Sequence, residues 1–273
     1  MPELPEVETT RRGIEPHVVG AGIAEVIIRR YDLRWPVSEN LPELEGAVFV
    51  SVKRRSKYLL LETEAGETVL MHLGMSGSLR VIPPGQDWKK HDHIGITLTN
   101  GLQLRYHDPR RFGLVLRVAA SEIQAHPLLV NLGPEPLEED FTGKHLHTAL
   151  RKKTIAIKVA VMDAKTVVGV GNIYASESLF RAGVHPQLPA NKLTKPKAER
   201  LVLAIKEVLA ESITQGGTTL RDFLNSDGEP GYFKQRLFVY DRKGEPCRVC
   251  GTPVSHCVLG QRSTYWCGVC QKR

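Results

Sequence analysis

The hydrophobic and polar positions predict first a helix and then a long β-rich region. Apolar residues recur at helical spacing in residues 5–17, and the glycines that follow end this segment. From residue 23 to 119 the pattern changes to short runs rich in β-branched residues, and Asn100-Gly101 between two of them is a strong hairpin signal. So many short strands predict an antiparallel sandwich or barrel. The predicted strands cover residues 24–29, 48–53, 58–62, 68–72, 78–82, 94–99, 102–106 and 112–118.

A second region begins near residue 132, where two prolines and an acidic run interrupt the strand pattern. Helical spacing then returns, and Gly183 and Gly216-Gly217 are natural helix stops. A polar, glycine-rich passage over 218–233 is too long for an ordinary connection, which predicts a functional loop. The helices are predicted at residues 144–152, 157–163, 174–182 and 196–215, and the domains at 1–131, 132–236 and 237–273.

Length and composition support a soluble globular protein of more than one domain, and the pattern of helices and strands predicts an α+β fold class. The chain has 273 residues, of which 41% are hydrophobic and 25% charged, so neither disorder nor membrane insertion is indicated. No apolar run is long enough for a membrane span, and the acidic, proline-containing start does not resemble a secretory signal. We therefore expect a cytoplasmic protein. Its net charge of +7 is compatible with a polyanionic partner but does not require one.

The C-terminal tail contains two pairs of cysteines, each with two residues between its members. Sixteen residues separate the pairs, and this paired spacing favours zinc over disulfides in a cytosolic chain. Because four thiolates fill the coordination sphere, we expect one structural Zn²⁺ in a zinc-ribbon hairpin, with Arg262 near its tip. Cys257 fits neither pair and is interpreted as a small apolar side chain. The predicted ligands are Cys247, Cys250, Cys267 and Cys270.

Several other features favour a nucleic-acid partner. The glycine-rich turn at 168–174 lacks the lysine of a nucleotide-triphosphate loop, but its amides and Asn172 at a helix start suit a single backbone phosphate. Met75 and Phe112 are apolar side chains in poor positions for a core, and apolar wedges beside basic groups unstack a duplex. Each basic cluster could also be a solvated face, but together they predict a phosphate-tracking surface. These clusters lie at residues 54–57, 89–93, 108–112 and 151–153.

The first residues of the chain admit two interpretations. If Met1 is removed, the secondary amine of Pro2 could attack an aldehydic carbon and form a cationic iminium, with the carboxylates of Glu3 and Glu6 nearby. Alternatively, the prolines start a helix and the glutamates complement its dipole. Taken alone, these residues favour the helix start; the rest of the chain favours the nucleophile.

The chain contains an ordered set of motifs at residues 2–8, 57–60, 72–77, 108–113 and 171–174, at Glu177 and at the four cysteines of the tail. On these motifs, the whole sequence resembles the bacterial formamidopyrimidine-DNA glycosylases, the 8-oxoguanine DNA glycosylase/AP lyases. That resemblance implies an N-terminal helix with a two-layer antiparallel β-sandwich, a helix-two-turn-helix region and a zinc hairpin. It also implies that loop 218–233 closes over an extruded lesion.

The resemblance also implies residue roles. Pro2 is expected to attack C1′ of the damaged nucleoside, and Glu3 to act as its acid/base partner. Lys57 is expected to transfer protons during elimination, and Arg262 to bind phosphate and assist the final elimination. The implied partner is double-stranded DNA containing oxidised purines, bound by a monomer. DNA contacts are implied for His91, Arg110, Lys153, Lys158 and Asn172, and filling of the gap left by the extruded base for Met75, Arg110 and Phe112.

Two alternatives stay open at this point. The sister endonuclease VIII type usually has glycine where Leu4 stands here, and it prefers oxidised pyrimidines. A zinc-containing DNA-binding protein without catalysis would share the basic clusters and the cysteines. Retention of Met1 would block the Pro2 amine and favour that binding protein.

Overall fold

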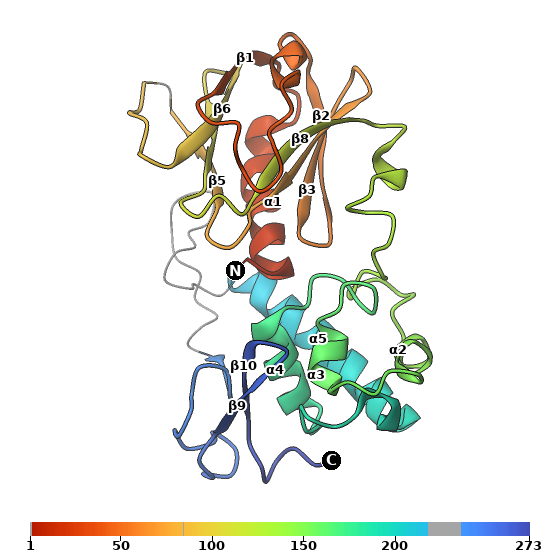
Figure 1. Ribbon diagram of the computed structural model, residues 1–273. Helices are drawn as coiled ribbons and strands as arrows, with labels where there is room; N and C mark the ends of the chain where they lie inside the picture. Colours follow the sequence, from red (N-terminus) through yellow and green to blue (C-terminus); the bar gives the residue numbers. More distant parts are fainter. Residues whose placement is uncertain (1, 84, 218–235) are drawn as a thin grey trace. The chain divides into compact units, whose positions relative to one another are not determined.

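The computed structural model describes residues 2–83, 85–217 and 236–273, and these separate into two compact units (Figure 1). Residues 2–130 and 215–217 belong to the first unit, and residues 131–214 and 236–273 to the second. Met1 and the predicted functional loop 218–233 lie outside the described residues. No helix among the described residues is long and apolar enough to cross a membrane.

The first unit is a helix combined with two antiparallel sheets (Figure 1). One sheet has the strand order β1-β6-β7-β5 and the other β2-β3-β4-β8. Apolar residues of both sheets and of the helix form one buried core, which confirms the predicted sandwich. The elements are α1 (Leu4–Val18), β1 (Ile23–Ile28), η1 (Leu41–Leu44), β2 (Phe49–Arg55), β3 (Tyr58–Thr63), β4 (Glu67–His72), β5 (Ser78–Ile82), β6 (Asp92–Leu98), β7 (Gln103–His107), β8 (Leu114–Ala119) and η2 (Ile123–Ala125).

One predicted strand begins later than its sequence pattern indicates. The apolar run at 112–118 predicts a strand from Phe112, but β8 starts at Leu114. Arg111 has a φ of +56°, which strands do not adopt, and the Gly113 N–H donates to the Asp108 carboxylate instead of to a neighbouring strand. Phe112 is therefore held in a loop, where its side chain is 41% exposed.

The second unit is helical and ends in a strand hairpin. The buried face of its longest helix contains the apolar residues expected from the sequence, Leu201, Ile205, Val208 and Leu209. Its elements are α2 (Gly143–Leu150), α3 (Ile157–Val161), α4 (Asn172–Arg181), η3 (Ala190–Lys192), α5 (Lys195–Thr214), β9 (Ser255–Leu259) and β10 (Arg262–Trp266).

A buried carboxylate attaches the zinc-binding segment to α4. Glu177 is 4% exposed and accepts hydrogen bonds from the backbone N–H groups of Phe238, Val239 and Tyr240 at 2.8, 3.0 and 2.8 Å. Burial raises the pKa of Glu177, although these hydrogen bonds favour the charged form. Because all three amides lie in one short segment, Glu177 fixes where the chain enters the cysteine-bearing tail.

Candidate active site and DNA-binding surface

The described start of the chain is shielded from solvent. Pro2 is buried, and Glu3 and Glu6 are each 2% exposed. Glu3 is the N-cap of α1, and its N–H donates to the Glu6 carboxylate at 2.8 Å as part of a capping box. Pro5 occupies the first helical turn, as the helix-start interpretation expected. The helix therefore holds Pro2 and two carboxylates together, so the two interpretations are compatible.

Lys57 lies in the two-residue turn between β2 and β3, close to a neutral histidine. Burial and the positive charges of Lys57 and Arg34 lower the pKa of His72 to about 4. His72 Nδ1 accepts the N–H of Gly74 at 2.9 Å, which leaves the ring proton on Nε2. Near neutral pH His72 is uncharged, so it adds no further positive charge beside the Lys57 amine.

Two loops that carry predicted wedges are packed against each other. Gly74 has a φ of +65°, and a Cβ there would lie 2.5 Å from the Gly113 nitrogen and 2.6 Å from the Phe112 carbonyl carbon. Only glycine allows this approach, which places the Met75 loop beside the Phe112 loop. The Arg110 guanidinium lies 5.0 Å from the centre of the exposed Phe112 ring. Thus an apolar side chain and a cation are presented together, as a wedge beside a phosphate requires.

Asp108 connects this wedge loop to His91. It is fully buried; its carboxylate accepts the Gly113 N–H at 2.8 Å, and its own N–H donates to the His91 carbonyl at 3.0 Å. His93 Nε2 lies 2.8 Å from the Asp108 carbonyl oxygen. The Asp108 backbone and side chain therefore fix both the wedge and a predicted DNA contact.

The basic loop before β6 is fixed by a second buried carboxylate. Asp92 is 2% exposed and forms ion pairs with Arg80 at 2.8 Å and with Arg105 at 3.0 Å. It also accepts the Lys89 N–H at 3.0 Å and lies 2.8 Å from His107 Nδ1. Burial alone would raise the pKa of Asp92, but these partners outweigh it and hold the pKa below its ordinary value.

We predict that Asp92→Ala destabilises the protein by about 3–5 kcal/mol, because it leaves buried arginines without their counter-ion. Urea unfolding at pH 7 measures this loss. The carboxylate stabilises the fold only while it is charged. Its contribution is complete above the unfolded-state pKa of about 3.9, and it falls as pH drops toward the lower folded-state pKa. The difference between wild type and variant must therefore shrink in acid.

The control for Asp92→Ala is Glu43→Ala, because the Glu43 side chain is 67% exposed in its pair with Arg117. That change should cost less than about 1 kcal/mol. Equal losses for the two variants would contradict a special role for Asp92.

In the second unit, a buried lysine joins the α4 start to the C-terminal hairpin. Lys158 is fully buried, and its Nζ contacts the Asn172 side-chain oxygen, the Ser263 carbonyl at 3.0 Å and Thr264 Oγ1 at 2.9 Å. Asn172 is the first residue of α4, as the predicted phosphate turn requires. The DNA contact of Lys158 stays a prediction. We expect its contribution to come through Asn172 and the hairpin, since its donors already have acceptors.

Arg262 lies at the hairpin turn, where the sequence places it. It is exposed and begins β10 opposite Leu259, after a two-residue turn in which Gly260 and Gln261 have φ values of +54° and +61°. A Cβ at Gly260 would lie 3.2 Å from a Val159 methyl group, so the tip of the hairpin packs on α3. This packing fixes the base of the Arg262 side chain.

Lys153 is half-buried and paired within the second unit. Its Nζ lies 2.7 Å from the Asp163 carboxylate and 2.8 Å from Thr166 Oγ1. Its contact with DNA stays a prediction, and such a contact would have to share the ammonium group with Asp163.

Four cysteines form the zinc centre predicted from their spacing. Their sulfur atoms all lie within 4.8 Å of one another, with 3.4 Å between Cys250 and Cys267 and 3.9 Å between Cys247 and Cys270. Zn–S bonds of about 2.3 Å in a tetrahedron require sulfur atoms about 3.8 Å apart. The donor set therefore fits one structural Zn²⁺ and leaves no open coordination position. Cys257 lies outside this cluster, as expected.

Three family models together match nearly the whole chain. Residues 1–115 match the formamidopyrimidine-DNA glycosylase N-terminal domain, and residues 132–224 match its H2TH domain. Residues 244–273 match a zinc finger found in FPG and IleRS. The chain belongs to the formamidopyrimidine-DNA glycosylase family. It is therefore a DNA glycosylase of base-excision repair, as the sequence predicts.

Relatives of this family match over their full lengths. The formamidopyrimidine-DNA glycosylases of Shigella dysenteriae and of Escherichia coli O6:H1 are each 57% identical over 272 residues, with 100% of both chains covered. The MutM protein of Thermus thermophilus is 40% identical, with a TM-score of 0.89 and coverage of 99% of this chain and 98% of that one. A point mutant of the Lactococcus lactis enzyme in complex with DNA containing Fapy-dG is 33% identical, with a TM-score of 0.93 over 100% of both chains.

Sequence reasoning did not single out the buried carboxylates that position these residues. Asp92 and Asp108 each lie within a basic cluster. A single acidic residue among basic ones was the signal in the sequence that could have indicated a buried ion pair. Glu8 was read only as a complement to the helix dipole. Arg11 and Arg12 lie within one helical turn of Glu8, but Arg54 comes from β2, so spacing along the chain could not identify that pair.

Proposed function

We propose that this chain removes oxidised purines, 8-oxoguanine and formamidopyrimidines, from duplex DNA and then cleaves the strand as an AP lyase. The observation that carries this proposal is the placement of Pro2 at the start of α1, with the buried carboxylates of Glu3 and Glu6 beside it. A point mutant of the Lactococcus lactis Fpg in complex with Fapy-dG DNA, at 33% identity and a TM-score of 0.93, supports the lesion class. The Lactococcus lactis Fpg in complex with abasic-site DNA, at 33% identity and a TM-score of 0.91, supports an abasic site as a substrate.

The proposed reaction uses the Pro2 amine as the nucleophile. Its nitrogen attacks C1′, the bond from C1′ to the base breaks, and the base leaves with a proton. Glu3 gives a proton to the ring oxygen as the sugar opens, which leaves an iminium between Pro2 and C1′. The iminium acidifies the C2′ proton; its removal expels the 3′ phosphate, and loss of the C4′ proton then expels the 5′ phosphate. Lys57 is the proposed proton-transfer group for these eliminations. Arg262 is proposed to bind phosphate and to assist the final elimination.

We propose a set of residues that contact the DNA. The predicted contacts are His91, Arg110, Lys153, Lys158 and Asn172, and the gap in the stack is filled by Met75, Arg110 and Phe112. Since a glycosylase must extrude its target nucleotide, a wedge and a nucleophile in one chain support this function. We also propose that the protein is a cytoplasmic monomer. Its proposed domains are residues 1–131, 132–236 and 237–273.

Borohydride reduction during turnover tests the nucleophile. With 8-oxoguanine duplex, a reduced covalent adduct should form, and peptide mapping should place it on Pro2. An adduct on a lysine would overturn the assignment. A cleavage panel that favours thymine glycol over 8-oxoguanine would instead support the endonuclease VIII type, and absence of any adduct with retained Met1 would support a non-catalytic binding protein.

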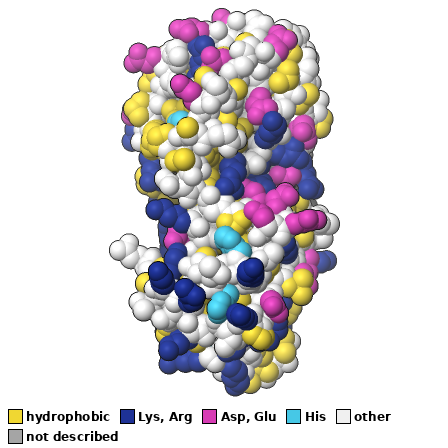
Figure 2. Space-filling view, turned by 90° about the vertical axis from the view of Figure 1, so that its right-hand side faces the viewer, with side chains coloured by type: hydrophobic (Ala, Val, Ile, Leu, Met, Phe, Trp, Pro, Cys, Tyr) yellow, Lys and Arg dark blue, Asp and Glu magenta, His cyan; other side chains and the backbone are white. Residues whose placement is uncertain are grey.

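We predict that DNA binding weakens steeply with salt. On the face drawn in Figure 2, dark blue Lys and Arg side chains with few carboxylates among them gather in the lower part of the view. Each phosphate neutralised should contribute about −0.9 to the slope of log K against log salt concentration. Fluorescence anisotropy with an undamaged duplex between low and moderate salt measures this slope. An affinity that does not change with salt would exclude the basic clusters as the DNA-binding surface.

A further inference from the structure

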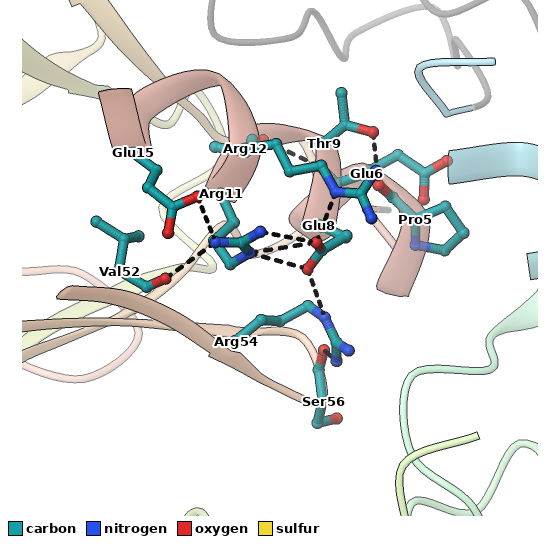
Figure 3. A network of polar contacts seen from close by, with 11 residues as sticks. Pro5, Glu6, Glu8, Thr9, Arg11, Arg12, Glu15, Val52, Arg54 and Ser56 are labelled. Carbon is teal, nitrogen blue, oxygen red and sulfur yellow. Dashed lines mark hydrogen bonds and ion pairs between the residues drawn. The ribbon is translucent and has the colours of Figure 1, made fainter. Parts of the chain in front are cut away.

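A buried carboxylate on α1 gathers three arginines around it (Figure 3). The Glu8 side chain is 12% exposed, and its oxygens lie 2.8 Å from Arg12 Nε, 3.1 Å from Arg11 Nη2 and 3.2 Å from Arg54 Nε. Arg12 is mostly exposed, whereas Arg54 is as buried as Glu8. Arg11 and Arg12 belong to the same helix as Glu8, but Arg54 belongs to β2. The Glu8–Arg54 pair therefore connects the helix to the sheet.

Glu8 keeps its charge in this environment. Burial alone would raise the pKa of Glu8, but hydrogen bonds from Arg11 and Arg12 and the charge of Arg54 hold it below its ordinary value. Near neutral pH the Glu8 carboxylate is therefore ionised, and its ion pair with Arg54 is maintained.

The other end of Arg54 holds the turn that carries Lys57. Arg54 Nη1 donates to the Ser56 carbonyl oxygen at 3.0 Å (Figure 3). Ser56 is 4% exposed and has a φ of +56°, a left-handed conformation that is uncommon for residues other than glycine. The hydrogen bond helps to hold this conformation against its intrinsic cost.

The Ser56 carbonyl belongs to the peptide group that leads into Lys57. The atoms of a peptide group share one plane, so the bond from Arg54 to this oxygen restrains the plane and with it the position of the Lys57 Cα. Glu8 itself lies on the helix that begins immediately after Glu3. A continuous path of contacts therefore runs from the helix of Pro2 and Glu3, through Glu8 and Arg54, to the backbone of Lys57.

We propose that Glu8 and Arg54 are positioning residues that set the Lys57 amine relative to the Pro2 end of α1. This inference rests on the proposed role of Lys57 in elimination. Neither residue is proposed to touch the DNA sugar; they act through the geometry of the turn. General acid–base groups contribute about 10²–10⁴-fold, and misplacement of a reacting group by about 1 Å can cost about 10²-fold.

Single-turnover elimination on a preformed abasic-site duplex tests this proposal in a double-mutant cycle. Arg54→Met should lower the elimination rate about tenfold, and Lys57→Met should lower it by at least that factor. Since Arg54 acts through Lys57, adding Arg54→Met to Lys57→Met should change the rate less than about twofold. Glu8→Gln should reproduce the Arg54→Met effect in part, because Arg54 then loses its carboxylate but can still reach Ser56.

The matched control is Lys53→Met, which removes a cation from the same strand. Lys53 pairs with Glu62, is 61% exposed and touches neither Glu8 nor Ser56. The elimination rate of the Lys53→Met variant should therefore stay within about twofold of wild type. Thermal melts and DNA affinities of each variant identify any loss of elimination rate that comes from unfolding or weaker binding. If Arg54→Met does not fold, Arg54→Lys takes its place as the test variant.

An additive loss in the double variant would overturn the positioning role while leaving the proposed function intact. Wild-type rates for Lys57→Met, with the Pro2 adduct still formed, would overturn both the role of Lys57 and the inference built on it.

Discussion

A chain carrying one extra glycine between Met1 and Pro2 should lose strand cleavage by at least about 10³-fold, because its Pro2 nitrogen is an amide. The amide lone pair is delocalised into the carbonyl group and cannot attack C1′. The new terminal amine would also lie one residue farther from Glu3, whose backbone is fixed by the capping box with Glu6. Cleavage of an 8-oxoguanine duplex and borohydride trapping measure the loss.

The control for this insertion is one glycine added after Arg273, which changes the length equally and leaves Pro2 untouched. It should cleave at the wild-type rate. Both chains should bind abasic-site duplex with similar affinity, since the DNA contacts are predicted elsewhere. Cleavage by the N-terminally extended chain at wild-type rate would exclude the Pro2 amine as nucleophile, whatever its binding.

Replacing a zinc ligand should have the next largest effect. Cys250→Ser should release the metal and weaken DNA binding at least about tenfold, since structural zinc contributes about 10–16 kcal/mol to the folding of small zinc domains. The physical link is the hairpin: Arg262 begins β10, and the neighbouring Ser263 and Thr264 accept from Lys158. When the hairpin loosens, Arg262 loses its orientation and Lys158 loses two acceptors. Metal analysis and anisotropy measure the two losses.

Cys257→Ser provides the matched control for zinc loss, because Cys257 lies on β9 outside the sulfur cluster. It should retain one zinc per chain and wild-type affinity. Unchanged DNA affinity in Cys250→Ser after confirmed loss of the metal would show that the hairpin does not contribute to binding.

Much of the fold was predictable because its determinants are local. The period of apolar residues placed the predicted strands and helices close to their observed positions, and Asn100-Gly101 forms the turn between β6 and β7. Phe112 is the instructive exception. Its apolar character predicted a strand residue, but the Asp108 carboxylate captures the Gly113 N–H and keeps Phe112 in a loop. A side chain competing for a backbone donor is a tertiary effect that residue patterns do not report.

The sequence by itself determined the elements, the zinc ligands and the motifs that place the chain in its family. Each of these depends on residues within a few positions or on fixed spacing, which is visible along the chain. Only the tertiary structure decided which charged groups are buried and what they hold. Arg54 meets Glu8 across 46 positions, and Lys158 meets Thr264 across 106. A buried ion needs partners that replace water, and the fold supplies those partners from distant segments.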